Sequence, residues 1–234
     1  MAESVAVRES TSRGNQAATV SRMRDLEPLF SPQSIAVVGA SSRPGTAGNE
    51  ILKNLIAAPF AGVVYPVNPK SKSIMGIRCL PSVSAIDEKV DLVVMIIPAA
   101  AVEKAIVECA DRGTKHFLVI SAGFKEIGGE GVEREKRLKA LCDERGLSVL
   151  GPNCLGLINT APNVRMNAAF GGRMPAAGSM GLISQSGALA AALLDYANGR
   201  GIGFSRFVSF GNKADINEID LLTTWPTTRR RRSS

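Results

Sequence analysis

Short, nearly continuous apolar runs recur along this chain and alternate with stretches of helical periodicity. The runs lie at residues 35–38, 63–67, 92–97, 117–120 and 147–150. Strands buried on both faces of a parallel sheet have this pattern, because helices cover them on either side. Amphipathic stretches at 46–58, 99–112 and 132–145 separate the runs. This alternation predicts an α/β fold with a right-handed, doubly wound parallel sheet.

A second strand and helix pattern follows later in the chain. It predicts a strand at 180–184, a helix at 187–198 and a strand at 204–209, which is too little for a complete second sheet. The expected organisation is a disordered leader at 1–22, a first domain at 23–159, a linker at 160–178, an incomplete second domain at 179–222 and a basic tail at 223–234.

The composition excludes several classes of protein. Of the 234 residues, 45% are hydrophobic and 21% are charged, which is typical of a globular chain and unlike collagen, a disordered protein or a disulfide-stapled domain. The most apolar run, 92–102, contains Pro98 and is too short to span a bilayer, so no membrane segment is expected. The first thirty residues contain no apolar core of a secretory signal.

The net charge of +7 is not evidence for a nucleic-acid partner, because the arginines at 229–232 supply four of the seven charges. A mildly basic remainder is typical of proteins that bind small anions. The four cysteines form no CxxC pair and are accompanied by a single histidine. We therefore predict no metal site, and a reduced chain in the cytoplasm.

The loops at the carboxyl ends of the strands are the first candidates for a ligand site. After the first strand the chain reads Gly39, Ala40, Ser41, Ser42, Arg43, Pro44 and Gly45. Small residues let backbone N–H groups approach an anion where the next helix begins, and Arg43 adds a charged contact. A tight turn without a ligand is the alternative, and the loop is not GxGxxG, since Ser41 replaces the second glycine.

The end of the second strand discriminates between nucleotide ligands. An NAD site requires an acid there, whereas this chain has Asn68 followed by Lys70 and Lys72. Lysines favour a ligand that carries phosphate near its adenosine ribose, which is CoA or NADP rather than NAD. Solvated loop charges are the alternative. Later loops, which contain Pro98, Ser121 and Asn153, converge on the same edge of the sheet.

Six ordered strings resemble one known family: IAVVGAS, VYPVNPK, ISAGFKEIG, GPNCLGLIN, GLISQSGAL and FVSFGNKAD. They are similar to the CoA-binding half of the NDP-forming acyl-CoA synthetases, the group that includes ADP-forming acetyl-CoA synthetase and, more distantly, the succinyl-CoA ligase α subunit. The similarity extends over about residues 26–222, and six motifs in order are far more specific than one glycine loop. It implies a Rossmann-like CoA-binding domain followed by an incomplete flavodoxin-like domain.

The resemblance also implies roles for individual residues. The candidate CoA-binding residues are Gly39, Ser41, Ser42, Arg43, Pro44, Gly45, Lys70, Pro98, Ile120, Ser121, Ala122, Asn153 and Cys154. Ala122 replaces an acidic residue of the succinyl-CoA ligases, so the acyl specificity of that branch is not implied. Cys154 lies near the expected thiol end of CoA, either as a nucleophile or as a buried structural thiol.

Three further residues, Ser184, Ser186 and Gly187, resemble a phosphate-binding helix N-terminus, although a Ser N-cap is also an ordinary helix start. Family catalysis passes a phosphoryl group from an acyl phosphate to a histidine and then to ADP on a partner half. His116, the single histidine, precedes a strand and is expected to pack or cap there. The resemblance thus implies CoA as ligand, with ADP, ATP and Mg²⁺ bound only through an ATP-grasp β subunit or domain.

The string TTWPTTRRRRSS at 223–234 departs from the family, whose next helix resembles DYLADDPETKVI. One set of codons for this tail spells the family helix when it is read from the last base of the Leu222 codon. We therefore hypothesise a single-base deletion followed by an early stop. We also expect residues 160–222 to leave apolar surface exposed and the C-terminal third to be prone to aggregation.

Three functions remain open. The favoured one is a CoA or acyl-CoA binding module, derived from an acid–thiol ligase and not catalytic alone. The second is a functional α half of an ADP-forming acyl-CoA synthetase that works with a partner chain. The third, an NADP-dependent oxidoreductase, is disfavoured because no residue with the chemistry of a hydride site is evident.

Overall fold

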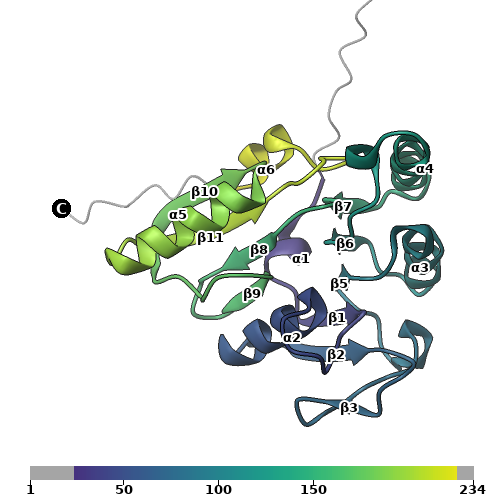
Figure 1. The fold of residues 1–234 in the computed structure, drawn as a ribbon, viewed down its shortest axis with the longest axis horizontal. Helices are drawn as coiled ribbons and strands as arrows, with labels where there is room; N and C mark the ends of the chain where they lie inside the picture. The colour runs from purple at the N-terminus through teal and green to yellow at the C-terminus, as the bar shows by residue number, and fades with distance from the viewer. Residues whose placement is uncertain (1–23, 226–234) are drawn as a thin grey trace, which may run out of the picture.

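The computed structural model describes residues 24–225, which form two larger sheets and one two-stranded sheet (Figure 1). The predicted leader, 1–22, and residues 226–234 of the predicted tail lie outside these residues. The first sheet has five parallel strands in the order β2-β1-β5-β6-β7. They are β1 (Ser34–Val38), β2 (Val63–Val67), β5 (Leu92–Met95), β6 (His116–Val119) and β7 (Ser148–Leu150).

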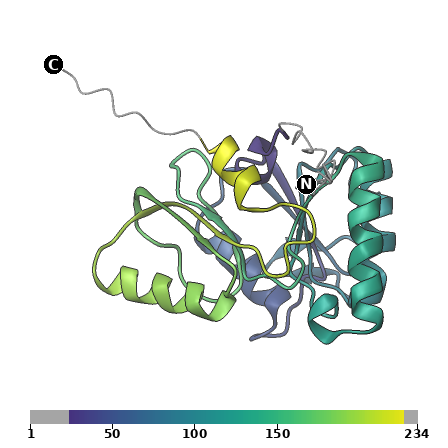
Figure 2. The ribbon, with the colours of Figure 1, turned by 90° about the horizontal axis from the view of Figure 1, so that it is seen from above.

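Helices cover both faces of the first sheet, so the predicted doubly wound fold is confirmed. Figure 2 shows α3 (Ala99–Asp111) and α4 (Glu130–Arg145) on one face and α2 (Ala47–Ala57) on the other. Successive strand residues point to opposite faces. In β1, Ile35 and Val37 pack in the core with α2, whereas Ala36 and Val38 pack in the core with α3 and α4.

Shorter elements complete this part of the fold. A short helix, α1 (Glu27–Phe30), precedes β1, and the two-residue strands β3 (Ser73–Ile74) and β4 (Ile77–Arg78) pair with each other after β2. Two 3-10 helices, η1 (Val83–Ala85) and η2 (Lys125–Ile127), lie in loops.

The second sheet has four strands in the order β10-β11-β8-β9. These are β8 (Gly156–Asn159), β9 (Met166–Ala169), β10 (Ala177–Ser184) and β11 (Phe204–Ser209). The pair β10 and β11 is parallel and is connected by α5 (Gly187–Gly199), whereas β8 and β9 are antiparallel to their neighbours. One face of this sheet packs on α5 and the other joins the core that contains α2.

The second sheet differs from the predicted organisation. Residues 160–178, which we predicted to be a linker, contain β9 and the start of β10, and β8 lies within the predicted first domain but pairs in the second sheet. No local signal marks β9, because its sequence Met-Asn-Ala-Ala lacks β-branched and aromatic residues. Pairing with β8 and cover by α2 stabilise it instead: the Asn54 side chain donates a 2.7 Å hydrogen bond to the Ala169 carbonyl.

The first residues of the predicted tail are part of the fold. Helix α6 (Glu218–Thr224) begins at Asn217 with a capping box and extends through Thr224. The Trp225 ring then meets the Phe30 ring edge to face, with centroids 6.0 Å apart. The helix continues past Leu222 to Thr224, and it ends where the Trp225 N–H donates to the Leu221 carbonyl at 2.8 Å. None of the helices in residues 24–225 is long and apolar enough to cross a membrane.

Candidate functional site

Two adjoining cavities lie along the carboxyl edge of the first sheet. The first has a volume of about 600 Å³ and contains Lys70, and the second has a volume of about 830 Å³ and contains Cys154. We call them the Lys70 cavity and the Cys154 cavity. Ala47, Ile96 and Ile97 line both, so the two spaces meet where α2 begins.

The Lys70 cavity is built around the first loop, where two glycines allow close backbone approach. Gly39 has a φ of +94°, and a Cβ there would overlap the Ile96 carbonyl. A Cβ on Gly48, in the first turn of α2, would overlap the Gly39 carbonyl. The close approach brings the N-terminus of α2 against the end of β1, which is a geometry suited to binding an anion.

The structure brings only part of the predicted glycine-loop set to this cavity. Gly39, Ser41, Lys70 and Pro98 line it. The remaining predicted residues, Ser42, Arg43, Pro44 and Gly45, are exposed and are not among its lining residues. The loop turns outward there: the Arg43 N–H donates to the Ser41 hydroxyl at 3.0 Å, and the Thr46 hydroxyl donates to the Arg43 carbonyl at 2.8 Å.

Asn68, which stands where an NAD site has an acid, lines the Lys70 cavity and organises its backbone. Its amide donates to the Ala40 carbonyl at 2.8 Å, and its side-chain oxygen accepts from the Lys70 N–H at 2.8 Å. These two bonds tie the loop after β2 to the loop after β1. Asn68 thereby fixes the backbone at Lys70.

Glu108, a carboxylate on α3, also lines the Lys70 cavity and was not among the predicted residues. Its Oε1 accepts a 2.5 Å hydrogen bond from the Ser84 hydroxyl. Nothing in its sequence context distinguishes it from an exposed helix charge, because the contact depends on how η1 packs beside α3. The cavity thus holds one cationic and one anionic side chain.

The Cys154 cavity has no charged side chain among its lining residues. Five predicted residues lie on it together, namely Ile120, Ser121, Ala122, Asn153 and Cys154. The Ser121 hydroxyl donates to the Ile97 carbonyl at 2.6 Å. Second-sheet loops and α5 supply the opposite wall, which includes Phe170, Gly171 and Ala191. Such a space suits a neutral ligand.

The surroundings of Cys154 favour a structural thiol over a nucleophile. Its side chain is buried, and its S–H donates to the Val119 carbonyl at 3.4 Å. Burial raises the pKa of this thiol to about 12, and backbone hydrogen bonds offset only part of that effect. A thiol with such a high pKa does not supply the thiolate that nucleophilic catalysis requires.

The three predicted phosphate-binding residues differ in their placement. Gly187, in the first turn of α5, lines the Cys154 cavity, whereas Ser184 and Ser186 do not. Ser186 is the N-cap of α5, and its hydroxyl accepts from the Leu189 N–H at 3.3 Å. The Ser184 hydroxyl donates to the Ser186 carbonyl at 3.0 Å. The serines therefore build the helix start, and Gln185 reaches the cavity beside Gly187.

Asn212, which lies in the loop after β11, lines the Cys154 cavity and was also not among the predicted residues. Its amide donates to Glu126 at 2.6 Å and to Glu135 at 2.8 Å, while its side-chain oxygen faces the Asn153 amide at 3.3 Å. Lys125 pairs with Glu135 at 3.0 Å. Asn212 could have been found from the sequence, because it lies in the family-like string FGNKAD.

The hydrogen bonds of this network affect the charge of Glu126. Burial raises the pKa of its carboxyl, but hydrogen bonds donated by Asn212 and by the backbone of residues 123–126 outweigh burial, so the pKa is lower than usual. Glu126 therefore remains a carboxylate and holds Asn212 in place at the cavity wall.

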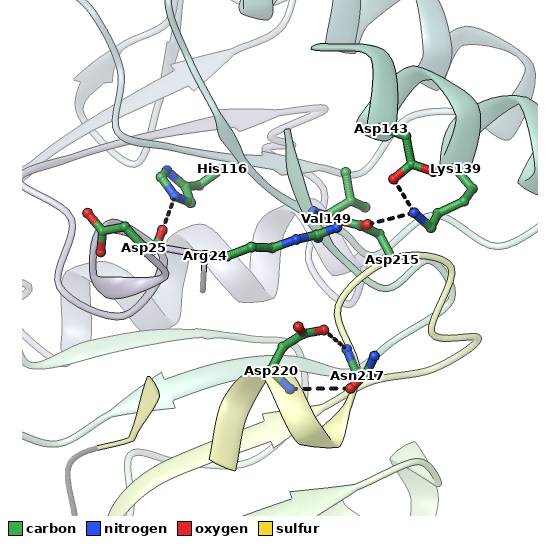
Figure 3. Close-up of polar contacts among 9 residues, drawn as sticks. All are labelled: Arg24, Asp25, His116, Lys139, Asp143, Val149, Asp215, Asn217 and Asp220. Carbon is green, nitrogen blue, oxygen red and sulfur yellow. Dashed lines mark hydrogen bonds and ion pairs between the residues drawn. The ribbon is translucent and has the colours of Figure 1, made fainter. Parts of the chain in front are cut away.

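His116 does not lie at the cavities. It is the first residue of β6, and so lies at the edge of the sheet opposite to the strands' carboxyl ends. Figure 3 shows its ring directed at the Asp25 backbone, where the ring nitrogen lies 3.0 Å from the carbonyl oxygen. The same view shows Arg24 and Lys139 directed at the buried carboxylate of Asp215. His116 thus contacts backbone at the start of a strand, which is the kind of contact that its sequence context predicted.

Burial lowers the pKa of His116 below its ordinary value of 6.5, although the Asp25 carbonyl opposes this effect. The folded protein therefore binds fewer protons than the unfolded chain as the pH falls through 6.5. The neutral His116 ring contributes to the free energy of unfolding above pH 6.5, and this contribution is lost as the pH falls toward the lower pKa of the folded state. We expect His116→Gln to lose less stability than the wild type between about pH 7.5 and about pH 5. Urea unfolding at each pH measures this difference. Parallel stability curves for the two proteins would contradict it.

The two cavities fit CoA in their chemistry. CoA has an anionic nucleotide end and a long, neutral pantetheine arm. Lys70 and the start of α2 lie at one cavity, and only uncharged residues lie at the other. A charged end and a neutral end in one continuous space match this division.

Comparison with known proteins finds a CoA-binding family. Residues 33–160 match the family model described as a CoA binding domain, and residues 177–232 match the succinyl-CoA ligase like flavodoxin domain. An ADP-forming acetate–CoA ligase of Archaeoglobus fulgidus is 46% identical over 197 residues, which cover 84% of this chain and 28% of that protein. The α subunit of an ADP-forming acetate–CoA ligase from Pyrococcus furiosus is 42% identical, over 84% of this chain and 43% of that subunit.

A solved structure agrees with these relatives. The dinucleotide forming acetyl-coenzyme A synthetase 1 of Ca. Korarchaeum cryptofilum, in complex with phosphate and ADP, has a TM-score of 0.80 and 45% identity, over 85% of this chain and 42% of that one. The chain therefore spans less than half the length of the relatives it matches. The match to the CoA-binding model and these relatives confirm the resemblance: the chain belongs to the CoA-binding domain family of the ADP-forming acyl-CoA synthetases.

Proposed function

We propose that this chain binds CoA or acyl-CoA along the Lys70 and Cys154 cavities and is not catalytic alone. The observation that carries the proposal is the shared lining of the two cavities, which gives one space with a lysine at one end and no charge at the other. The relatives, which are ADP-forming acetate–CoA ligases, support CoA as the ligand.

In this arrangement the nucleotide end of CoA lies at the Lys70 cavity. Lys70 pairs with a phosphate of the ligand, and the N-terminus of α2, at Ala47 and Gly48, stabilises negative charge beside it. The pantetheine arm passes Ile96 and Ile97 into the Cys154 cavity. The thiol or acyl end then lies among Ala122, Asn153 and the start of α5.

The reaction of such a ligase interconverts acyl-CoA, ADP and phosphate with carboxylate, ATP and CoA. A phosphoryl acceptor is needed between the acyl phosphate and ADP. His116, the single histidine of the sequence, bonds to the Asp25 backbone at the opposite edge of the sheet. We therefore assign ADP, ATP and Mg²⁺ to a partner subunit or domain of the ATP-grasp type, and the α half of a two-part ligase is the alternative function. We also infer a cytoplasmic location, because the four cysteines are free thiols.

Calorimetric titration of the full chain with CoA tests the proposal, with NAD and NADP as comparison ligands in the same salt. We expect saturable binding of CoA and no competition by either dinucleotide. Binding of NADP in preference to CoA would favour the oxidoreductase instead. A folded chain that binds none of the three would contradict the proposal.

A coupled assay distinguishes the binding module from the two-part ligase. ADP- and CoA-dependent acyl turnover is measured with and without an ATP-grasp β subunit. No turnover in either case, with CoA binding retained, is expected for the module. Turnover that appears when the subunit is added favours the α half of a ligase, and turnover by the chain alone would contradict the proposed lack of catalysis.

A further inference from the structure

The segment between β11 and α6 follows a strand of the second sheet but lies against a loop of the first (Figure 1). The Asn212 N–H donates to the Pro152 carbonyl at 2.9 Å. Gly211 has a φ of +59°, and a Cβ there would overlap the carbonyls of Pro152 and Asn153. This close approach places the Asn212 side chain at the wall of the Cys154 cavity.

Two carboxylates fix the orientation of the Asn212 amide. Its nitrogen donates to Glu126 Oε2 at 2.6 Å and to Glu135 Oε2 at 2.8 Å. Hydrogen bonds hold the pKa of Glu126 below its usual value, and the Lys125 ammonium group pairs with Glu135 at 3.0 Å. Because a carboxylate accepts hydrogen bonds and does not donate them, the amide nitrogen has to face this pair. The Asn212 side-chain oxygen is therefore turned toward Asn153.

The Asn212 oxygen in turn fixes the orientation of the Asn153 amide. Asn153 has a φ of +55°, a backbone conformation that Asn tolerates better than most residues. Its side-chain nitrogen donates to Asn212 Oδ1 at 3.3 Å. The Asn153 side-chain oxygen is thus directed away from Asn212, and no hydrogen bond within residues 24–225 uses it. Since Asn153 lines the Cys154 cavity, this oxygen is an acceptor available to a ligand there.

Glu126 extends this arrangement to a third loop. Its Oε1 accepts from the N–H groups of Gly123 and Phe124, in the loop after β6. Its Oε2 accepts from Asn212, in the loop after β11, and Asn212 bonds to Asn153, in the loop after β7. These three side chains therefore join three loops, from both larger sheets, around one end of the cavity.

We propose that Asn212 is a positioning residue for CoA, and that it turns the Asn153 side-chain oxygen toward an N–H of the pantetheine arm. This inference rests on the proposed function, in which the thiol end of the ligand lies beside Asn153. The amide of the arm nearer the thiol is the group that this placement brings to Asn153. Its N–H enters the cavity with an acceptor already oriented, so its desolvation is offset. A neutral acceptor suits this cavity, because no charged side chain lines it.

Asn212→Asp tests the proposal, because it keeps the size of the side chain and removes the donor. The new carboxylate would face those of Glu126 and Glu135, and the repulsion would release Asn153. We expect CoA binding to weaken about 10- to 30-fold. Binding of the nucleotide half of CoA, made without its pantetheine arm, should change by less than about threefold, since Asn212 is not among the residues that line the Lys70 cavity. Calorimetric titration of the full chain measures both ligands.

Asn159→Asp is the matched control. Asn159 of β8 is 2% exposed, Asn212 is 7% exposed, and Asn159 lines neither cavity. The Asn159 amide donates to the Phe30 carbonyl at 2.8 Å, so this variant also loses a buried donor. It should destabilise the fold but leave CoA affinity within about threefold of the wild type. Equal losses of CoA affinity in the two variants, or equal losses of the two ligands in Asn212→Asp, would overturn the positioning role.

A ligand analogue tests the contact itself. A CoA analogue with an ester in place of the amide nearer the thiol lacks the N–H that the Asn153 oxygen would accept. The wild type should bind it about fivefold or more weakly than CoA, whereas Asn212→Asp should bind the two within about twofold of each other. A role of Asn212 in folding alone would leave this ratio unchanged. Equal binding of CoA and the ester by the wild type would also overturn the proposal.

Adding Glu126→Gln to Asn212→Asp exchanges the donor and the acceptor of the pair. The new amide nitrogen can donate to the carboxylate at position 212, while its oxygen still accepts from Gly123 and Phe124. We expect this double variant to bind CoA within about threefold of the wild type and to prefer CoA over the ester. It also decides the question if Asn212→Asp alone does not fold, because a double variant without recovered CoA binding would contradict the proposal. A wild type that binds no CoA would instead refute the proposed function, before any variant is compared.

Discussion

Lys70→Glu is expected to weaken CoA binding by about 10- to 100-fold. A hydrogen bond to a charged partner contributes about 1.5–3 kcal/mol, which corresponds to this range of affinity. Lys70 is the cationic side chain that lines the cavity assigned to the nucleotide end, and Asn68 fixes its backbone through the Lys70 N–H. The substituted carboxylate would add repulsion, since Glu108 already lines the same cavity. Calorimetry with CoA measures the change.

Lys72→Glu is the matched control. Lys72 is exposed and lies two residues further along the same loop, but it is not among the residues that line the cavity. We expect a change of less than about threefold, because a distant exposed charge is screened at physiological salt. Equal losses in the two variants, both disappearing at high salt, would mean that the loop attracts anions generally and that Lys70 makes no direct contact.

Much of the fold followed from local patterns in the sequence. The strands of the first sheet lie within about two residues of the predicted runs, since continuous apolar sequence is what a doubly covered parallel strand requires. The helix at 132–145 was predicted to end before Gly146, and Gly146 is the left-handed C-cap of α4. Strand β9 was missed because its stability derives from distant partners rather than from its own residues.

The candidate site was predictable where strand ends place it. The loops that contain Ser41, Lys70 and Ser121 all follow parallel strands of one sheet, so topology alone brings them together. The opposite wall of the Cys154 cavity was not predictable in this way. Phe170 and Asn212 reach it because the second sheet packs beside the first, and no local periodicity records that association.

Asp215→Ala is expected to destabilise the fold by about 2–3 kcal/mol, because it leaves the buried Val149 N–H without an acceptor and removes a charged hydrogen-bond partner of Arg24. The Asp215 side chain is fully buried and pairs with Arg24 at 2.6 Å (Figure 3). The same carboxylate accepts the Val149 N–H, which would be left without a partner at the edge of β7. Asp215 therefore connects the segment before α6 to the first sheet, and its loss should free β7 and α6 together.

Urea unfolding measures this change, with Trp225 as the single tryptophan and a reporter beside α6. Asp111→Ala is the control, because Asp111 pairs with Arg145 at 2.6 Å while remaining 63% exposed. That variant should lose less than about 1 kcal/mol, the usual value of a surface ion pair. Similar losses in the two variants would contradict a special role for Asp215. A large loss for Asp215→Ala, with the Trp225 signal changing before the far-ultraviolet circular dichroism, would instead show that Asp215 holds α6 on the first sheet.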